Sequence, residues 1–167
     1  MKNIELQKLD VDDSHKLFQL IDKNRDELRE HLGWLDKNKT ELDTKNFIEF
    51  KQKEEKELKS ITYKIVYNDE IVGIIDLHDI EKNKADIGYW LDKDQYGKGI
   101  MTIAVNKLID IGFNKYNFEI LNIFCGINNV KSQNIAKRLN FKYIETIKDR
   151  ENLYGRMVDN MHFQLLK

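Results

Sequence analysis

A glycine–lysine–glycine stretch in the middle of the chain has the composition of an anion-binding loop. Gly97 and Gly99 flank Lys98, and from Ile100 onward apolar residues recur at the three- to four-residue steps of an amphipathic helix. Glycines at a helix N-terminus let several backbone N–H groups approach one ligand, and the helix dipole favours negative charge there. The spacing therefore predicts a phosphate-binding loop. The alternative, a tight turn with Lys98 in water, stays open from these residues alone.

Two other phosphate-binding motifs do not fit the chain. A dinucleotide-binding fingerprint needs a third glycine where Thr102 stands, and no Gly-x-x-x-x-Gly-Lys-[Ser/Thr] motif occurs in the sequence. These differences disfavour dinucleotide redox chemistry and nucleotide hydrolysis.

Composition narrows the class of protein. A length of 167 residues suits one domain, residues 1–167, and 28 basic against 29 acidic residues leave a net charge of -1. Such a balance argues against nucleic acid or a membrane surface as a partner held by bulk charge. Cys125 is the single cysteine, so no internal disulfide can form, and the first residues lack the apolar run of a signal peptide. We expect a cytoplasmic protein.

The elements that must position the loop can be read from apolar periodicity. Strands are expected over residues 4–9, 61–67, 71–77, 86–91, 121–125, 141–147 and 158–166. Helices are expected from residue 12 or 13 to 21 and over residues 24–32, 41–58, 99–116 and 129–139. This order predicts a mixed α/β (α+β) fold. Trp34, in a polar connection, either lines a ligand cleft or covers the core.

Several of these segments together resemble a known family. They are Ile87-Gly88-Tyr89-Trp90-Leu91, then Gly97-Lys98-Gly99-Ile100-Met101-Thr102, Asn129-x-x-Ser132 and Asn140-Phe141, with Leu32-Gly33-Trp34-Leu35 nearer the N-terminus. In this order they resemble the acetyl-CoA-dependent N-acetyltransferases of the GNAT superfamily, and more narrowly its ribosomal-protein-serine N-acetyltransferase branch. The resemblance covers residues 4–166. It implies a twisted, mostly antiparallel sheet of about seven strands flanked by helices, with acetyl-CoA as cosubstrate and no metal.

The resemblance also implies which residues contact acetyl-CoA. They are Tyr89, Trp90, Leu91, Tyr96, Gly97, Lys98, Gly99, Ile100, Met101, Thr102 and Asn129. The pyrophosphate would bind the loop, and the backbone of the strand would pair with the pantetheine. The chain departs from the superfamily loop pattern [Gln/Arg]-x-x-Gly-x-[Gly/Ala] at both ends, where Tyr96 and Met101 stand, so the backbone cradle should remain without the usual first side chain. Asn129 is also a candidate cap of its own helix.

Catalytic roles follow from the same resemblance. Many members of the superfamily carry a tyrosine as the acid on the last helix, but Ala136 holds that position here, and Ser132 matches the branch's proposed substitute. Glu151 matches its proposed general base; the alternative is a solvent-facing loop carboxylate. His78 is a second candidate base or a bystander. Cys125 is expected to be a packed thiol, not an acyl carrier.

The acceptor is less well defined by the sequence. Trp34 and His78 are the candidate acceptor-binding residues. The resemblance implies direct attack on acetyl-CoA by a protein N-terminal α-amine; a small-molecule amine, an amino acid and a non-catalytic acyl-CoA-binding domain are the alternatives. The four histidines are scattered and no Cys-x-x-Cys occurs, so no metal site is predicted. Homodimers are common among relatives, so a homodimer is the assembly that the resemblance suggests.

Overall fold

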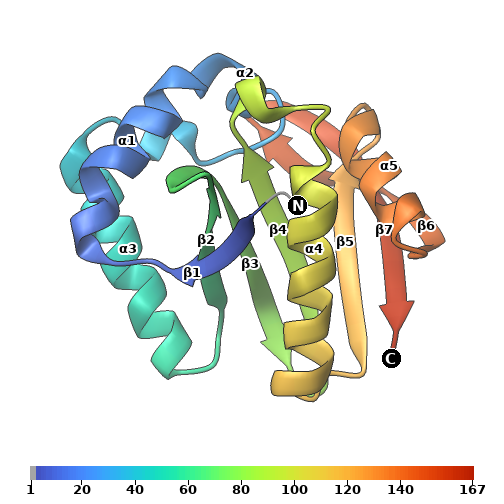
Figure 1. The fold of residues 1–167 in the computed structure, drawn as a ribbon. Helices are drawn as coiled ribbons and strands as arrows, with labels where there is room; N and C mark the ends of the chain where they lie inside the picture. Colours follow the sequence, from blue (N-terminus) through green and yellow to red (C-terminus); the bar gives the residue numbers. More distant parts are fainter. Residues whose placement is uncertain (1–2) are drawn as a thin grey trace.

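A twisted seven-stranded sheet forms the centre of the computed structural model, which describes residues 3–167 (Figure 1). Its strand order is β1-β2-β3-β4-β5-β7-β6. The strands are β1 (Ile4–Lys8), β2 (Ile61–Tyr67), β3 (Glu70–Glu81), β4 (Lys84–Leu91), β5 (Ile120–Gly126), β6 (Lys142–Leu153) and β7 (Arg156–Leu166). The α-helices are α1 (Ser14–Lys23), α2 (Arg25–Arg29), α3 (Glu41–Lys56), α4 (Ile100–Asp110) and α5 (Val130–Arg138). The mixed fold with a mostly antiparallel sheet is thus confirmed.

One pairing in the sheet is parallel, and it is short. β4 and β5 pair only from Lys84↔Ile120 to Asp86↔Asn122, whereas β5 pairs with β7 along its whole length. Beyond Asp86 the two strands diverge (Figure 1). The side of β4 that faces β5 is therefore open over residues 87–91, because its other side is already paired with β3.

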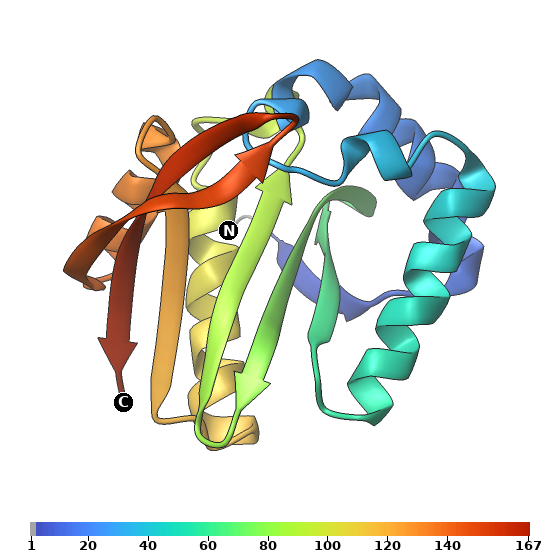
Figure 2. The same cartoon turned by 180° about the vertical axis from the view of Figure 1, so that it is seen from behind.

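Two hydrophobic cores lie on opposite faces of the sheet. Successive residues of a strand point to opposite faces, and in β3 Ile75 belongs to the core under α4 while Ile74 belongs to the core under α1 and α3. In the same way Leu91 and Trp90 of β4 are divided between the two cores. The helices of the N-terminal third cover only part of their face. In the view from behind, strands β3, β4 and β5 run uncovered by any described helix between α3 and the β6–β7 hairpin (Figure 2).

The helix starts agree with the predicted caps. The Asn129 side chain accepts a hydrogen bond from the Ser132 backbone N–H at 3.2 Å and so caps α5. Gly99 is the N-cap of α4 and has a left-handed backbone, with φ of 76°. Asn140, just after the end of α5, has φ of 64°, the left-handed conformation that commonly ends a helix.

Several predicted boundaries differ from the structure: the strand expected over residues 71–77 extends to Glu81, and the helix expected over residues 24–32 ends at Arg29. The α-helix expected to reach residue 116 ends at Asp110 and continues as a wider π-type turn over Ile111–Lys115. Strand β6, expected to end at residue 147, extends to Leu153, and it forms a hairpin with β7 that turns at Tyr154 and Gly155. Register shifts at Tyr143/Glu145 and Ile147/Glu151 interrupt the alternation along β6, which is why its second half did not look like a strand. No helix among residues 3–167 is long and apolar enough to cross a membrane.

Candidate active site

A cavity of about 880 Å³ lies where β4 and β5 diverge. Its walls come from the edge of β4, the starts of α4 and α5, helix α2 and the β6–β7 hairpin. Most of the predicted site residues line it: Tyr89, Trp90, Leu91, Tyr96, Gly97, Gly99, Ile100, Met101, Thr102, Asn129, Ser132, His78 and Glu151. The two exceptions are Lys98 and Trp34, so the structure gathers residues from distant parts of the sequence around one space.

The glycine loop forms one end of this cavity. Gly97 and Gly99 have φ values of 74° and 76°, a left-handed conformation that glycine adopts at little cost. A Cβ at either position would meet nothing within 4 Å, so the glycines serve the backbone conformation and leave open space in front of the loop. Lys98 is exposed, and its Nζ donates to Gln95 Oε1 at 2.9 Å. The anion-binding potential of the loop thus comes from its backbone and the α4 N-terminus.

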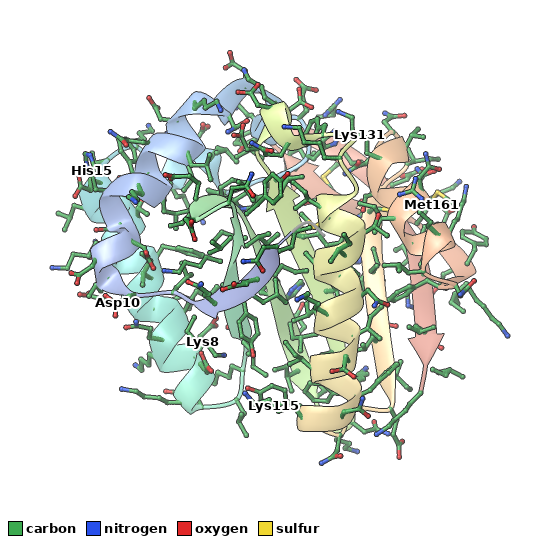
Figure 3. The ribbon with its side chains drawn as sticks, viewed as in Figure 1. Lys8, Asp10, His15, Lys115, Lys131 and Met161 are labelled. Atoms are coloured by element: carbon green, nitrogen blue, oxygen red, sulfur yellow. The ribbon has the colours of Figure 1, made fainter. Side chains whose placement is uncertain are left out.

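Two cations beside the loop were missed by the sequence reasoning. Arg138, in the last turn of α5, donates from Nη1 to Thr102 Oγ1 at 3.1 Å. Lys131, labelled in Figure 3, lies at the start of α5, 4.0 Å from the centre of the Tyr96 ring and 3.2 Å from Glu27 Oε1. Both side chains line the cavity. Their spacing along α5 gave no signal, because only the packing of α5 against the α4 N-terminus brings them to the glycine loop.

Ser132 is hydrogen-bonded to a tyrosine that the sequence had assigned only a backbone role. Its side chain is buried in the first turn of α5, and Oγ lies 2.7 Å from Tyr89 Oη. Burial raises the pKa of Tyr89 against the opposing effect of this hydrogen bond. Burial likewise raises the pKa of Cys125 to about 11, so the thiol is protonated at neutral pH, as expected for a packed thiol. Ala136 is fully buried in the core under α4, and the phenol nearest to Ser132 belongs to β4.

Glu151 lies within strand β6, not in a loop as its sequence position suggested. It pairs with Val158 of β7, is half-buried and faces the cavity. The Asn160 side-chain amide donates from Nδ2 to Glu151 Oε2 at 3.4 Å. Arg150, its neighbour, lies over the Phe124 ring at 3.7 Å. The reading of Glu151 as a solvent-facing loop carboxylate was therefore wrong.

His78 forms a close pair with Asp76, next to Gly88. His78 Nδ1 lies 2.9 Å from Asp76 Oδ1, and a Cβ on Gly88 would be only 2.7 Å from that oxygen. Burial opposes the charged imidazole, but the hydrogen bond to Asp76 and the negative charges of Asp76, Asp79 and Asp86 outweigh it and raise the pKa of His78. The ligand atoms of His78, Asp79 and Asp86 lie within 4.8 Å of one another, so one histidine that looked isolated in the sequence belongs to an acidic cluster.

A second, more open groove of about 1410 Å³ lies on the uncovered sheet face seen in Figure 2. Trp34 lines it, with its ring stacked on Phe47 at 6.5 Å between centroids. His78, Tyr89 and Phe124 line both this groove and the cavity, so the two spaces meet there. The candidate acceptor-binding residues Trp34 and His78 thus share one groove that leads to the cavity.

Tyr154 connects the hairpin to the N-terminal helices. From the β6–β7 turn its Oη donates to the Leu32 carbonyl at 2.6 Å and accepts from the Leu35 backbone N–H at 3.1 Å. The Arg29 guanidinium lies over its ring at 3.6 Å. These contacts hold the turn of the hairpin against the segment between α2 and α3.

Comparisons with known proteins agree with this architecture. The chain is 31% identical to YdaF of Bacillus subtilis over 172 residues, covering 99% of this chain and 92% of that protein. It is 29% identical to the ribosomal-protein-serine acetyltransferase of Escherichia coli, covering 95% of each. The structure of RimL, a ribosomal L7/L12 α-N-protein acetyltransferase in complex with coenzyme A, superposes with a TM-score of 0.94 at 25% identity, covering 98% of this chain and 93% of that one.

The family itself is shown by a match over most of the chain. Residues 3–142 match the family described as the Acetyltransferase (GNAT) domain. The matched region contains the glycine loop, the diverging β4 and β5, and the Ser132 helix. The protein therefore belongs to the GNAT acetyltransferase family.

Proposed function

We propose that the protein transfers the acetyl group of acetyl-CoA to the N-terminal α-amine of a protein, by direct attack within a ternary complex. The observation that carries the proposal is one cavity with the glycine loop at one end and with Ser132 and Glu151 in its walls. The printed names of the relatives, a ribosomal-protein-serine acetyltransferase and an L7/L12 α-N-protein acetyltransferase bound to coenzyme A, support this choice of acceptor and cosubstrate.

In this proposal the cosubstrate follows the open edge of β4. The backbone N–H groups of residues 97–102 bind the pyrophosphate, with Arg138 and Lys131 adding positive charge. The pantetheine runs along residues 89–91, whose backbone groups on this side are free to pair with its amides. One of these N–H groups also stabilises the oxyanion of the tetrahedral intermediate, the kind of donor that contributes most when it is already in position.

Two side chains handle the protons. Glu151 removes a proton from the attacking ammonium, and Ser132 protonates the departing CoA thiolate while its own Oγ is held by the Tyr89 hydroxyl. An α-amine with a pKa of about 8 costs only about 1.4 kcal/mol to deprotonate at pH 7, whereas a lysine amine of about 10.4 costs nearly 5 kcal/mol. A half-buried carboxylate is a sufficient base for the first, which favours an N-terminal acceptor.

The groove on the uncovered sheet face is the proposed route for the acceptor chain. It leads past Trp34 and His78 to the point where it meets the cavity. The acidic groups around His78 lie along this route and favour a cationic N-terminus by attraction. The acceptor would then reach the thioester from the side of the sheet opposite α4.

A panel of acceptors tests the function. The purified protein is given acetyl-CoA with a serine-initiated peptide, the same peptide with a blocked N-terminus and an internal lysine, a polyamine, and free amino acids. We expect one acetyl group on the unblocked N-terminus, located by mass spectrometry. Turnover on the polyamine or the amino acids alone would show that the acceptor is a small amine and not a protein N-terminus. Coenzyme A binding without turnover on any amine would contradict an enzymatic role.

A further inference from the structure

Asn160 carries a buried oxygen without a hydrogen-bond partner. The residue is 2% exposed, lies on β7 and lines the cavity. Among the described residues, its Oδ1 and Thr62 Oγ1 are the two buried side-chain polar atoms that have no partner. Buried polar atoms of folded proteins nearly always have one. Thr62 lies on β2 away from the cavity, so of the two only Asn160 is placed to meet a ligand.

The orientation of the Asn160 amide is fixed by Glu151. Its Nδ2 donates to Glu151 Oε2 at 3.4 Å, and the reversed amide would set two oxygens against each other. Oδ1 is therefore the end of the amide left over for another donor. Asn160 and Glu151 both line the cavity, and their oxygens are hydrogen-bond acceptors that offer a ligand no donor.

We propose that Asn160 binds the amino group of the acceptor, in concert with Glu151. A primary ammonium has three N–H donors and no acceptor, which complements this pair of oxygens. After Glu151 has taken one proton, the neutral amine still has an N–H for Asn160 while its lone pair attacks the thioester. The two oxygens together therefore disfavour a tertiary amine, whose cation has a single N–H donor. This inference rests on the proposed N-acetyltransferase function.

Single variants of the purified protein test the role of Asn160 in acceptor binding. Asn160→Leu keeps the size of the side chain and removes Oδ1, and we expect the KM for a serine-initiated peptide to rise about 10- to 100-fold, the span of one hydrogen bond to a charged group. The KM for acetyl-CoA should change less than twofold. Asn160→Asp, which keeps an oxygen acceptor but loses the donor to Glu151, should lose less. Thr62→Val is the matched control, because it removes the other unpartnered oxygen, and its KM values should equal those of the wild type.

A binding measurement that needs no turnover completes the test. Calorimetry on the coenzyme A complex compares the peptide with its N-terminally N,N-dimethylated form, which has a single N–H donor as a cation. We expect the wild type to prefer the primary amine by about tenfold or more, and Asn160→Leu to lose most of this preference. Equal binding of the two peptides by the wild type would overturn the proposal even if every variant unfolds.

Three other results would also overturn it. A loss of acetyl-CoA affinity in Asn160→Leu with unchanged peptide KM would assign Oδ1 to the pantetheine. Asn160→Asp as weak as Asn160→Leu would show that the bond to Glu151 carries the effect. Unchanged kinetics in both variants would show that Oδ1 has no ligand. All three presuppose a wild type that acetylates the peptide, so they are distinct from failure of the proposed function itself.

Discussion

The two ends of the active-site cavity are built in different ways. At the loop end, two left-handed glycines and the start of α4 fix a set of backbone N–H groups, and Arg138 and Lys131 add positive charge beside them. At the end formed by the β6–β7 hairpin and α2, the groups offered to a ligand include the side chains of Glu151 and Asn160, which are hydrogen-bonded to each other. A backbone cradle tolerates sequence change around it, whereas a cluster of side chains can be altered one residue at a time. The first suits a cosubstrate shared by a whole family, and the second suits an acceptor that differs between members.

The largest effect should come from breaking the loop end. Gly99→Glu places a side chain and a negative charge in the space that is open in front of the loop, and we expect coenzyme A binding to fall below detection by calorimetry. The left-handed φ adds a strain of about 1–2 kcal/mol for any residue with a Cβ.

Gly155→Glu is the control that separates the strain of a left-handed φ from the blocking of the cavity. Gly155 has a φ of 89° and open space around it, but it lies in the turn of the hairpin and does not line the cavity. This variant should bind coenzyme A like the wild type. A folded Gly99→Glu variant with unchanged affinity would show that the loop is only a turn.

Ser132 sharpens the comparison because it lies between the two ends. Ser132→Ala should lower kcat by about 10²- to 10⁴-fold, the contribution of one acid–base group, with little change in coenzyme A affinity. Tyr89→Phe, which removes only the hydroxyl bonded to Ser132, should lose less. Ser14→Ala, at another buried serine outside the cavity, is the control and should keep full activity. An equal loss of coenzyme A binding in Ser132→Ala would make the serine a binding contact.

Glu151 tests the hairpin end of the cavity through the pH dependence of kcat/KM. Glu151→Gln should lower kcat/KM for a serine-initiated peptide chiefly near neutral pH, and raising the pH past the α-amine pKa of about 8 should recover much of the loss. The measurement is kcat/KM from pH 6 to 10. Glu145→Gln, on the exposed side of the same strand, should match the wild type. A deficit that stays constant with pH would indicate that Glu151 holds the acceptor without taking its proton.

The smallest effect is expected at His78. Its pKa is raised in the folded protein, so protonation stabilises the fold below the ordinary value of 6.5, and this contribution disappears as the pH rises through the raised pKa. The melting temperature of His78→Gln should therefore fall furthest below the wild type near pH 5.5 and approach it by pH 9. The pair with Asp76 is partly exposed, so the difference should be at most about 2–4 °C. His15→Gln, at an exposed helix position, is the control for the substitution itself, and a difference that grows toward pH 9 would contradict the assigned shift.

The same contrast explains what could be predicted from the sequence. The glycine loop, the Asn129 cap and the order of strands and helices along the chain follow from local patterns, because each depends on residues a few positions apart. The bond from Arg138 to Thr102, the Tyr89–Ser132 pair and the position of Glu151 depend on how α5 and the hairpin pack, which no local period encodes. The register shifts in β6 hid the second half of that strand for the same reason. The resemblance to the family supplied Ser132 and Glu151, but it supplied neither Asn160 nor Arg138.

The contacts of Tyr154 have a consequence for engineering acceptor selectivity. This one side chain bonds backbone groups 122 and 119 positions earlier in the chain, so the hairpin turn and the segment after α2 are shaped for each other. A graft that exchanges residues 29–50 for those of another family member keeps these two bonds only if its backbone holds the positions of Leu32 and Leu35. We therefore expect chimeras that carry both segments from one parent to keep the Tyr154 contacts more often than chimeras that exchange residues 29–50 alone.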